Sequence, residues 1–208
     1  MAIDVKSLLR TSDNLVRVQQ MSLSPVKHLV LETMWQLDKP AKASEIAKEI
    51  GLAFPPVMMH ILGLAKMKYA ETVEKGTYTI TEAGRRALGL PEISREKAAE
   101  ILAYLPVDKS FHFYADIGKP LNIYAASLGD FCDKLAKTDA SSLEFHLNRG
   151  DFEAWFTLLG DTELAKRTLL LRERKVFGEE LRNKLCHNVK NRCSMLTKIR
   201  NTQPTKLA

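Results

Sequence analysis

The stretch ASEIAKEIGLAFPPVMMHILGLAKMKYAETVEKGTYTITEAGRR, residues 43–86, decides the fold. Its apolar residues recur at three- or four-residue steps, which predicts a short helix over residues 45–50 and a longer one over about residues 55–67. Ser44 is the expected N-cap of the short helix, because its hydroxyl accepts a bond from an otherwise unpaired backbone amide. Gly51 supplies the turn between the helices, since glycine adopts a positive φ without strain. The stretch therefore begins with two helices joined by a tight turn.

The second half of this stretch predicts a β-hairpin followed by a further helix. Residues 69–73 alternate like a strand, and residues 77–80 return after a Glu-Lys-Gly turn. Gly76 lies where a tight hairpin turn requires a positive φ. Thr81 is the expected N-cap of the helix that follows the hairpin.

Upstream of this stretch, the sequence predicts one more helix. Ser24 is a good capping residue, Pro25 suits the first helical position, and Asp-Lys-Pro at residues 38–40 ends the helix. Three helices, a hairpin and a closing helix within residues 24–88 follow the order of a winged helix-turn-helix domain.

Two motifs in this segment resemble those of archaeal and bacterial winged helix-turn-helix transcription regulators. The first is ASEIA at residues 43–47, followed by Gly51, and the second is YTITEAGR at residues 78–85, which is similar to the exit from the wing in that group. The resemblance covers under a third of the chain and implies an archaeal regulator that binds DNA. Winged helices also bind RNA and protein partners, so the fold alone does not decide the function.

The following segment, residues 91–180, is expected to form a second, mostly helical domain. The motifs FH at residues 111–112 and FHLNRGDFEAW at residues 145–155 resemble an uncharacterised, mostly archaeal domain family, over about residues 98–180. That family brings no mechanism with it. The first motif is read as a strand or an apolar loop anchor, and residues 122–135 are read as helical.

The predicted fold class is mainly α with a small β-hairpin wing. The chain divides into an N-terminal arm or short helix (residues 1–23), the winged helix-turn-helix domain (24–90), the mostly helical second domain (91–180) and a long basic C-terminal helix with its tail (181–208).

The positive charge of the chain lies in its last segment. Residues 181–208 contain seven basic side chains and no acidic one, which leaves 24 basic against 25 acidic side chains in residues 1–180. Apolar residues recur at three- or four-residue steps over residues 177–199 and form one stripe on a helix. We expect this helix to pack by its stripe, in a homodimer, and to offer its charge to phosphate groups.

The predicted third helix has few side chains that read bases. Residues 54–59 are Phe-Pro-Pro-Val-Met-Met. Either some of these side chains pack against the wing or the second domain, or they form an exposed apolar patch that docks a protein partner. The predicted nucleic-acid contacts come from this helix, the wing, the closing helix and the C-terminal segment: His60, Lys66, Lys68, Lys75, Arg85, Arg86, Arg182, Lys184, Lys190, Arg192, Lys198 and Arg200.

Four polar residues of the second domain are candidates for a ligand pocket: His112, His146, Arg149 and Asp151. In a functional interpretation they converge on an anionic ligand, with Arg149 as the anion clamp. In a structural interpretation, which we favour, Asp151 caps a helix, Arg149 pairs with a carboxylate, and the histidines bind backbone groups beside an aromatic core.

The composition is that of a soluble globular protein, with 208 residues, 45% hydrophobic and 27% charged, and a net charge of +6. No apolar run is long enough to span a bilayer, and the N-terminus does not read as a signal peptide, so we expect a cytoplasmic protein with no membrane partner.

The three cysteines of the chain are too few for a disulfide framework, so we expect reduced thiols, and Cys186, His187 and Cys193 lack zinc-site spacing. The common catalytic and nucleotide-binding motifs are missing, so we expect no enzymatic activity and no cofactor.

Three functions are consistent with these observations. The first is a DNA-binding transcription regulator that grips the phosphate backbone with its wing and basic C-terminal segment. The second is an RNA- or ribosome-associated factor that uses the same basic surfaces, and the third is an adaptor that docks a protein through the apolar third helix.

Overall fold

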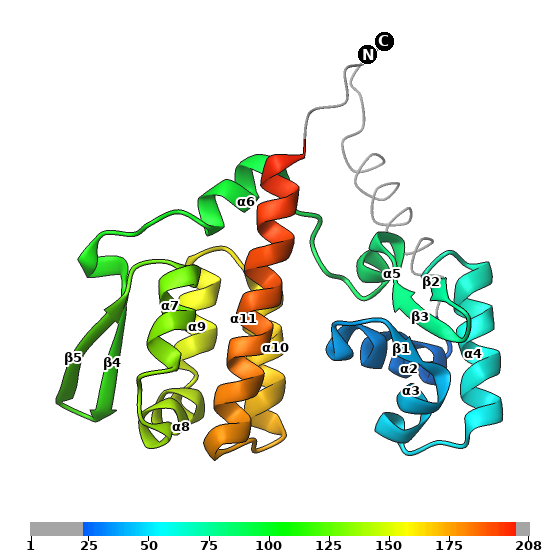
Figure 1. The fold of residues 1–208 in the computed structure, drawn as a ribbon, viewed down its shortest axis with the longest axis horizontal. Helices are drawn as coiled ribbons and strands as arrows, with labels where there is room; N and C mark the ends of the chain where they lie inside the picture. Colours follow the sequence, from blue (N-terminus) through cyan, green and yellow to red (C-terminus); the bar gives the residue numbers. More distant parts are fainter. Residues whose placement is uncertain (1–22, 203–208) are drawn as a thin grey trace, which may run out of the picture. The chain divides into compact units, whose positions relative to one another are not determined.

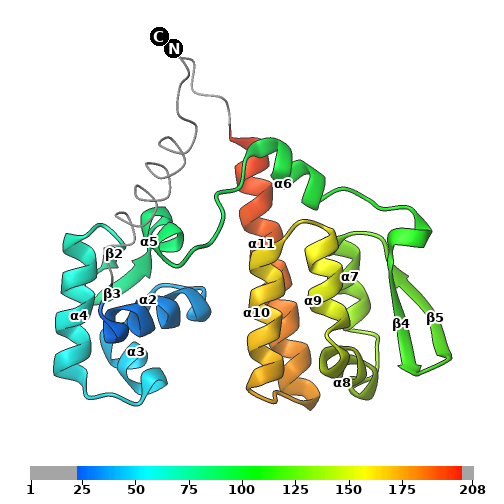
Figure 2. The ribbon, with the colours of Figure 1, turned by 180° about the vertical axis from the view of Figure 1, so that it is seen from behind.

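The computed structural model describes residues 23–202 (Figures 1 and 2). It is mainly helical with two small antiparallel sheets, which confirms the mainly α fold class at that level. The chain divides after Leu90 into an N-terminal unit and a C-terminal unit that begins at Pro91. The arm predicted over residues 1–23 lies, apart from Leu23, outside the described residues.

The N-terminal unit consists of packed helices and a three-stranded sheet (Figure 1). Its elements are α2 (Pro25–Leu37), β1 (Ala41–Lys42), α3 (Ala43–Ile50), α4 (Phe54–Lys66), β2 (Ala70–Glu74), β3 (Thr77–Ile80) and α5 (Glu82–Ala87). α2, α3 and α4 pack on one another, and the buried side chains of this core include Leu31, Trp35, Ile46, Ile61 and Leu64. Burial of each such side chain stabilises the unit by about 1.5–3 kcal/mol.

The sheet has the strand order β1-β3-β2 and is antiparallel throughout. Ala70 lies opposite Ile80 in the hairpin, whose turn contains Gly76 at a φ of 78°. The predicted hairpin is therefore confirmed. β1 was not predicted, because a strand of two residues shows no periodicity, but it pairs Ala41 with Tyr78.

The capping predictions are partly confirmed. Ser24 accepts a bond of 3.4 Å from the amide of Lys27, and Thr81 accepts one of 3.1 Å from the amide of Gly84. The prediction that Ser44 caps the second helix is wrong. α3 begins at Ala43, directly where the pairing of β1 ends, and its N-cap residue makes no side-chain capping bond.

Gly84 in the closing helix is required by a close backbone approach. A Cβ atom at this position would lie 2.2 Å from the carbonyl oxygen of Tyr69, a distance that no side chain can accept. The amide of Thr81 donates to the same carbonyl at 3.0 Å. The glycine of the YTITEAGR motif therefore lets α5 pack against the start of the hairpin.

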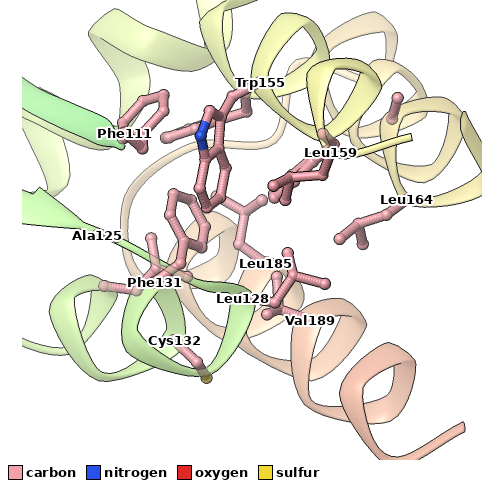
Figure 3. Close-up of a cluster of buried hydrophobic side chains, with 14 of the residues drawn as sticks. Phe111, Ala125, Leu128, Phe131, Cys132, Trp155, Leu159, Leu164, Leu185 and Val189 are labelled. Carbon is pink, nitrogen blue, oxygen red and sulfur yellow. The ribbon is translucent and has the colours of Figure 1, made fainter. Parts of the chain in front are cut away.

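The C-terminal unit is built around its last helix. Its elements are α6 (Arg95–Ile101), the 3-10 turn η1 (Val107–Lys109), β4 (Phe111–Asp116), β5 (Lys119–Ala125), α7 (Leu128–Leu135), α8 (Ala140–Arg149), α9 (Asp151–Leu158), α10 (Thr162–Glu173) and α11 (Gly178–Asn201). α11 packs against α6, α7, α8 and α10. Figure 3 shows Leu185 and Val189 of α11 in one apolar cluster with Phe131, Trp155 and Leu159.

Two expectations for this unit are confirmed only in part. The basic C-terminal segment is helical, as expected, but α11 belongs to the core of the C-terminal unit, because Leu181, Leu185, Val189 and Leu196 are fully buried there. The segment expected to be helical over residues 122–135 forms α7 over Leu128–Leu135, whereas its first residues belong to β5.

The burial of the apolar stripe inside the C-terminal unit removes the basis for a homodimer formed through it. Within residues 23–202, no helix combines the length and the apolarity that a membrane crossing requires.

Candidate nucleic-acid interface

α3 and α4 meet at a tight turn that sets the direction of α4. Gly51 has a φ of 74°, its amide donates to the carbonyl of Lys48 at 3.2 Å, and the amide of Leu52 donates to that of Ala47 at 3.0 Å. This pair of bonds closes the end of α3 as a Schellman motif. The buried side of α4 faces α2 and α3, so its opposite face points to solvent.

The solvent-facing side of α4 carries an apolar face, which we define as Phe54, Met59 and Leu62. Their exposed fractions are 50%, 68% and 40%. None of these side chains donates or accepts the hydrogen bonds by which base edges are distinguished. α4 also contains no acidic residue. Residues 54–59 are divided between two surroundings, because Val57 is fully buried and Met58 contacts Tyr78 of the hairpin, whereas Phe54 and Met59 are exposed on the N-terminal unit.

The exposed basic residues lie at the end of α4 and on the hairpin. Lys66 is in the last turn of α4, Lys68 follows it at a φ of 60°, and Lys75 occupies the hairpin turn. The backbone of Lys68 is held in place, because its carbonyl accepts a bond of 2.6 Å from the Thr81 hydroxyl. All three lysine side chains are exposed, whereas His60 is half-buried.

The two arginines of α5 have different surroundings. Arg85 is buried, and its Nε lies 3.6 Å from a carboxylate oxygen of Glu82. Arg85 is therefore not placed to contact phosphate, which corrects the expectation for this residue. Arg86 is exposed.

Two of the basic residues expected to bind nucleic acid on α11 are used inside the C-terminal unit. Arg192 is 3% exposed and is enclosed by carboxylates. Arg182 donates through Nη1 to the carbonyls of Leu135 and Thr138. Lys184 is exposed and pairs on the surface with Glu180 at 2.7 Å, and Lys190, Lys198 and Arg200 are also exposed.

The carboxylates around Arg192 form a buried ionic cluster that sequence reasoning missed. Arg192 Nε lies 2.7 Å from Asp161 Oδ2, and its Nη1 lies 2.5 Å from Glu163 Oε2. Glu163 also pairs with Arg167 at 3.3 Å, while Asp161 caps α10 by accepting from the amide of Leu164 at 3.1 Å. Only the capping role of Asp161 has a local sequence signal, namely an Asp directly before a helix.

Three of the four candidate pocket residues come together at the junction of α8 and α9. His146 Nδ1 lies 2.7 Å from Asp151 Oδ2, and Arg149 Nε lies 3.2 Å from the same oxygen. The backbone amide of Tyr114 donates to His146 Nε2 at 2.9 Å, so Nδ1 carries the proton and the ring is neutral. Burial lowers the pKa of His146, against the opposing pull of Asp151.

His112 does not join this group. Its Nε2 lies 2.8 Å from the carbonyl oxygen of Val107, and its ring stacks on Tyr124 with centroids 5.7 Å apart. His146, Arg149 and Asp151 contact one another, the amide of Tyr114 and the surrounding aromatic rings, as the structural interpretation expects. The expected capping by Asp151 is wrong, because Gly150 is the N-cap of α9 and Asp151 is its first residue.

Comparison of the chain with protein-family models, with curated proteins and with solved structures gave no match. The function is therefore inferred from the residues and contacts of the chain itself.

Proposed function

We propose that residues 24–88 are a winged helix-turn-helix domain and that the protein is a DNA-binding transcription regulator. The observation that carries the proposal is the succession of α3, the Gly51 turn and an α4 whose outer face is open to solvent, followed by the β2–β3 hairpin. In domains of this type the second helix of the pair enters the major groove, and the hairpin forms the wing.

The distribution of side chains favours contacts with the phosphate backbone over hydrogen bonds to base edges. The apolar face of α4 offers van der Waals contact to thymine methyl groups and no hydrogen bonds. Three lysines are exposed in the same unit, Lys66 in the last turn of α4, Lys68 shortly after it and Lys75 in the hairpin turn. We expect these lysines to pair with phosphates, and we expect little sequence preference.

The salt dependence of DNA binding tests this proposal. Each protein cation that pairs with a phosphate contributes about 0.9 to the slope of log K against log salt concentration on duplex DNA. We expect the double variant Lys66→Gln and Lys68→Gln to bind a duplex of about 30 base pairs more weakly, with a slope reduced by about 1.8. Fluorescence anisotropy at several salt concentrations measures both quantities.

The matched control replaces two exposed lysines of the C-terminal unit, Lys109 and Lys137, with glutamine. This variant removes the same net charge and should keep the slope of the wild type. Equal slopes for the two double variants would contradict the proposal, because binding would then follow net charge alone. Tighter binding to structured RNA than to duplex DNA would replace DNA with RNA as the target.

The exposed apolar face of α4 favours one second candidate function, an adaptor that docks a protein. The variant Met59→Asp and Leu62→Asp tests it, because both side chains are exposed and their replacement leaves the core of the unit intact. Met58 is avoided, since its sulfur lies 3.9 Å from the Tyr78 hydroxyl. Loss of a protein partner with DNA affinity unchanged would support the adaptor, and loss of DNA affinity would place α4 against DNA.

A further inference from the structure

All three cysteines of the chain gather where α7 packs on α11. Cys132 belongs to α7, and Cys186 and Cys193 lie two turns apart on α11. Figure 3 shows Cys132 at the edge of the apolar cluster. Each of the three is a free thiol. Helix packing thus brings together residues that are 54 positions apart in the sequence.

Two of these cysteines are neighbours across the packing of α7 on α11. The thiol of Cys132 donates to the backbone carbonyl oxygen of Cys186, with 3.9 Å between the sulfur and the oxygen. Cys132 is buried, whereas Cys186 is only half-buried. One member of the pair is therefore partly open to solvent, and the other is enclosed.

An open cavity of about 450 Å³ gives a small molecule access to this region. Cys132 and Cys193 line it together with Tyr104 and Lys190. Among residues 23–202, no group of three histidine, cysteine, aspartate or glutamate side chains is arranged to hold a metal ion. Two free cysteines that are neighbours across a helix packing, beside an open cavity, suit disulfide chemistry better than metal binding.

We propose that Cys132 and Cys186 form an oxidisable dithiol site, which a small-molecule disulfide converts into a covalent bridge between α7 and α11. This site is independent of the proposed DNA-binding surface, which lies in the N-terminal unit.

The reaction consists of two thiol–disulfide exchanges. The thiolate of Cys186 attacks one sulfur of the reagent RSSR, which forms a mixed disulfide and releases one thiolate that takes up the proton lost by Cys186. Cys132 then gives its proton to solvent and attacks the sulfur of Cys186, which releases the second thiol. Two protein thiols are oxidised, and one RSSR is reduced to two RSH.

The second exchange is the slow one at neutral pH. Burial is the main cause that raises the pKa of Cys132 to about 11, with a further contribution from Cys186 and an opposing one from Lys190. Only the thiolate attacks, so the rate of bridge closure should increase about tenfold for each pH unit below this pKa.

The test incubates the full-length reduced protein with glutathione disulfide at pH 9, followed by quenching with acid and mass spectrometry. We expect a loss of two hydrogens per chain, one cysteine left for alkylation, and a peptide that joins Cys132 to Cys186. Cys193→Ser is the matched control, because it removes the third cysteine of the cluster and should still lose two hydrogens. Cys132→Ser and Cys186→Ser should stop at the glutathione adduct.

A wild-type protein that stops at the glutathione adduct would overturn the proposal, as would a bridge that contains Cys193. The peptide map of the wild type gives this answer even if a variant fails to fold. A bridge found only after denaturation in urea would also overturn it, because the folded packing of α7 on α11 would then not be its cause.

Discussion

Arg192 lies between two buried carboxylates, although it belongs to the most basic stretch of the chain. A count of charges along the sequence assigns every lysine and arginine of such a stretch to the surface. Arg192 is nevertheless on the same side of α11 as Leu185, Val189 and Leu196, and the packing of that side encloses it. The negative charge that balances it comes from α10 and from the residue before it, so no local pattern could have predicted the cluster.

Replacement of Arg192 by methionine should strongly destabilise the C-terminal unit. The variant would leave Asp161 and Glu163 buried with part of their positive charge removed, and the loss of one partner of a buried ion pair typically costs about 3–5 kcal/mol. Urea denaturation followed by circular dichroism measures the change in the free energy of unfolding. Lys198→Met, on the exposed side of the same helix, serves as the control and should change it by less than about 0.5 kcal/mol.

An Arg192→Met variant whose free energy of unfolding equals that of the Lys198→Met control would contradict this prediction. It would show that the buried carboxylates of Asp161 and Glu163 do not depend on the charge of Arg192.

His146 should make the stability of the C-terminal unit depend on pH. Its folded-state pKa is lowered by burial, so the unfolded chain binds a proton more readily than the folded one. The free energy of unfolding should therefore be constant above the ordinary histidine pKa of about 6.5 and decrease as the pH falls below it, by at most about 1.4 kcal/mol per pH unit. Protonation of Nε2 would also remove the lone pair that accepts the hydrogen bond from the amide of Tyr114.

Urea denaturation at pH 7.5 and pH 5 measures this effect. His146→Gln should lose less stability than the wild type between the two pH values, whereas His112→Gln, at an exposed position, should lose as much as the wild type. Equal losses in all three proteins would assign the pH dependence to other groups.

At the scale of elements, several local signals agree with the structure, although the caps predicted at Ser44 and Asp151 do not. α2 and α5 begin after the residues predicted to cap them, and the hairpin turns at the glycine that requires a positive φ. These elements could be predicted because a capping hydroxyl or a glycine acts on its own backbone.

The errors fall on elements that exist only through a partner. β1 is two residues long and is a strand only because it pairs with β3. β5 has an apolar spacing that also suits a helix, and its pairing with β4 decides the outcome, with Asn122 at a φ of 56° beside a break in the register. Such choices depend on tertiary contacts, which override local preference.

The same distinction applies to the candidate site. The apolar outer face of α4 could be predicted only in part, because the sequence leaves open whether Phe54 and Met59 are exposed, and the structure decides it by giving the buried side to Val57, Ile61 and Leu64. The positions of Arg85 and Arg182 could not be predicted, because packing buries Arg85 and because Arg182 binds carbonyl groups that are distant in the sequence. The proposed interface is therefore smaller than the sequence predicted, and it is concentrated on the N-terminal unit.

At the scale of the whole molecule, removal of the basic helix α11 should affect the folding of the two units differently. Deletion of residues 178–208 takes Leu181, Leu185, Val189 and Leu196 out of the core of the C-terminal unit. Burial of four such side chains is worth roughly 6–12 kcal/mol, which equals the whole stability of a typical domain. We expect the remainder of this unit to unfold, while the N-terminal unit keeps its own core of α2, α3 and α4.

Limited proteolysis and nuclear magnetic resonance spectra of the truncated chain measure this outcome. Residues 24–90 should resist protease and keep dispersed amide resonances, whereas residues 91–177 should be cleaved quickly. If the proposed interface is correct, the truncated chain also retains most of its affinity for duplex DNA. A variant Lys190→Gln and Lys198→Gln of the full chain separates the roles of charge and fold, because both side chains are exposed and lie outside the core. A reduced salt slope in this variant would show that α11 also contacts the phosphates of DNA. A native spectrum for residues 91–177 after truncation would show that the C-terminal unit folds without α11.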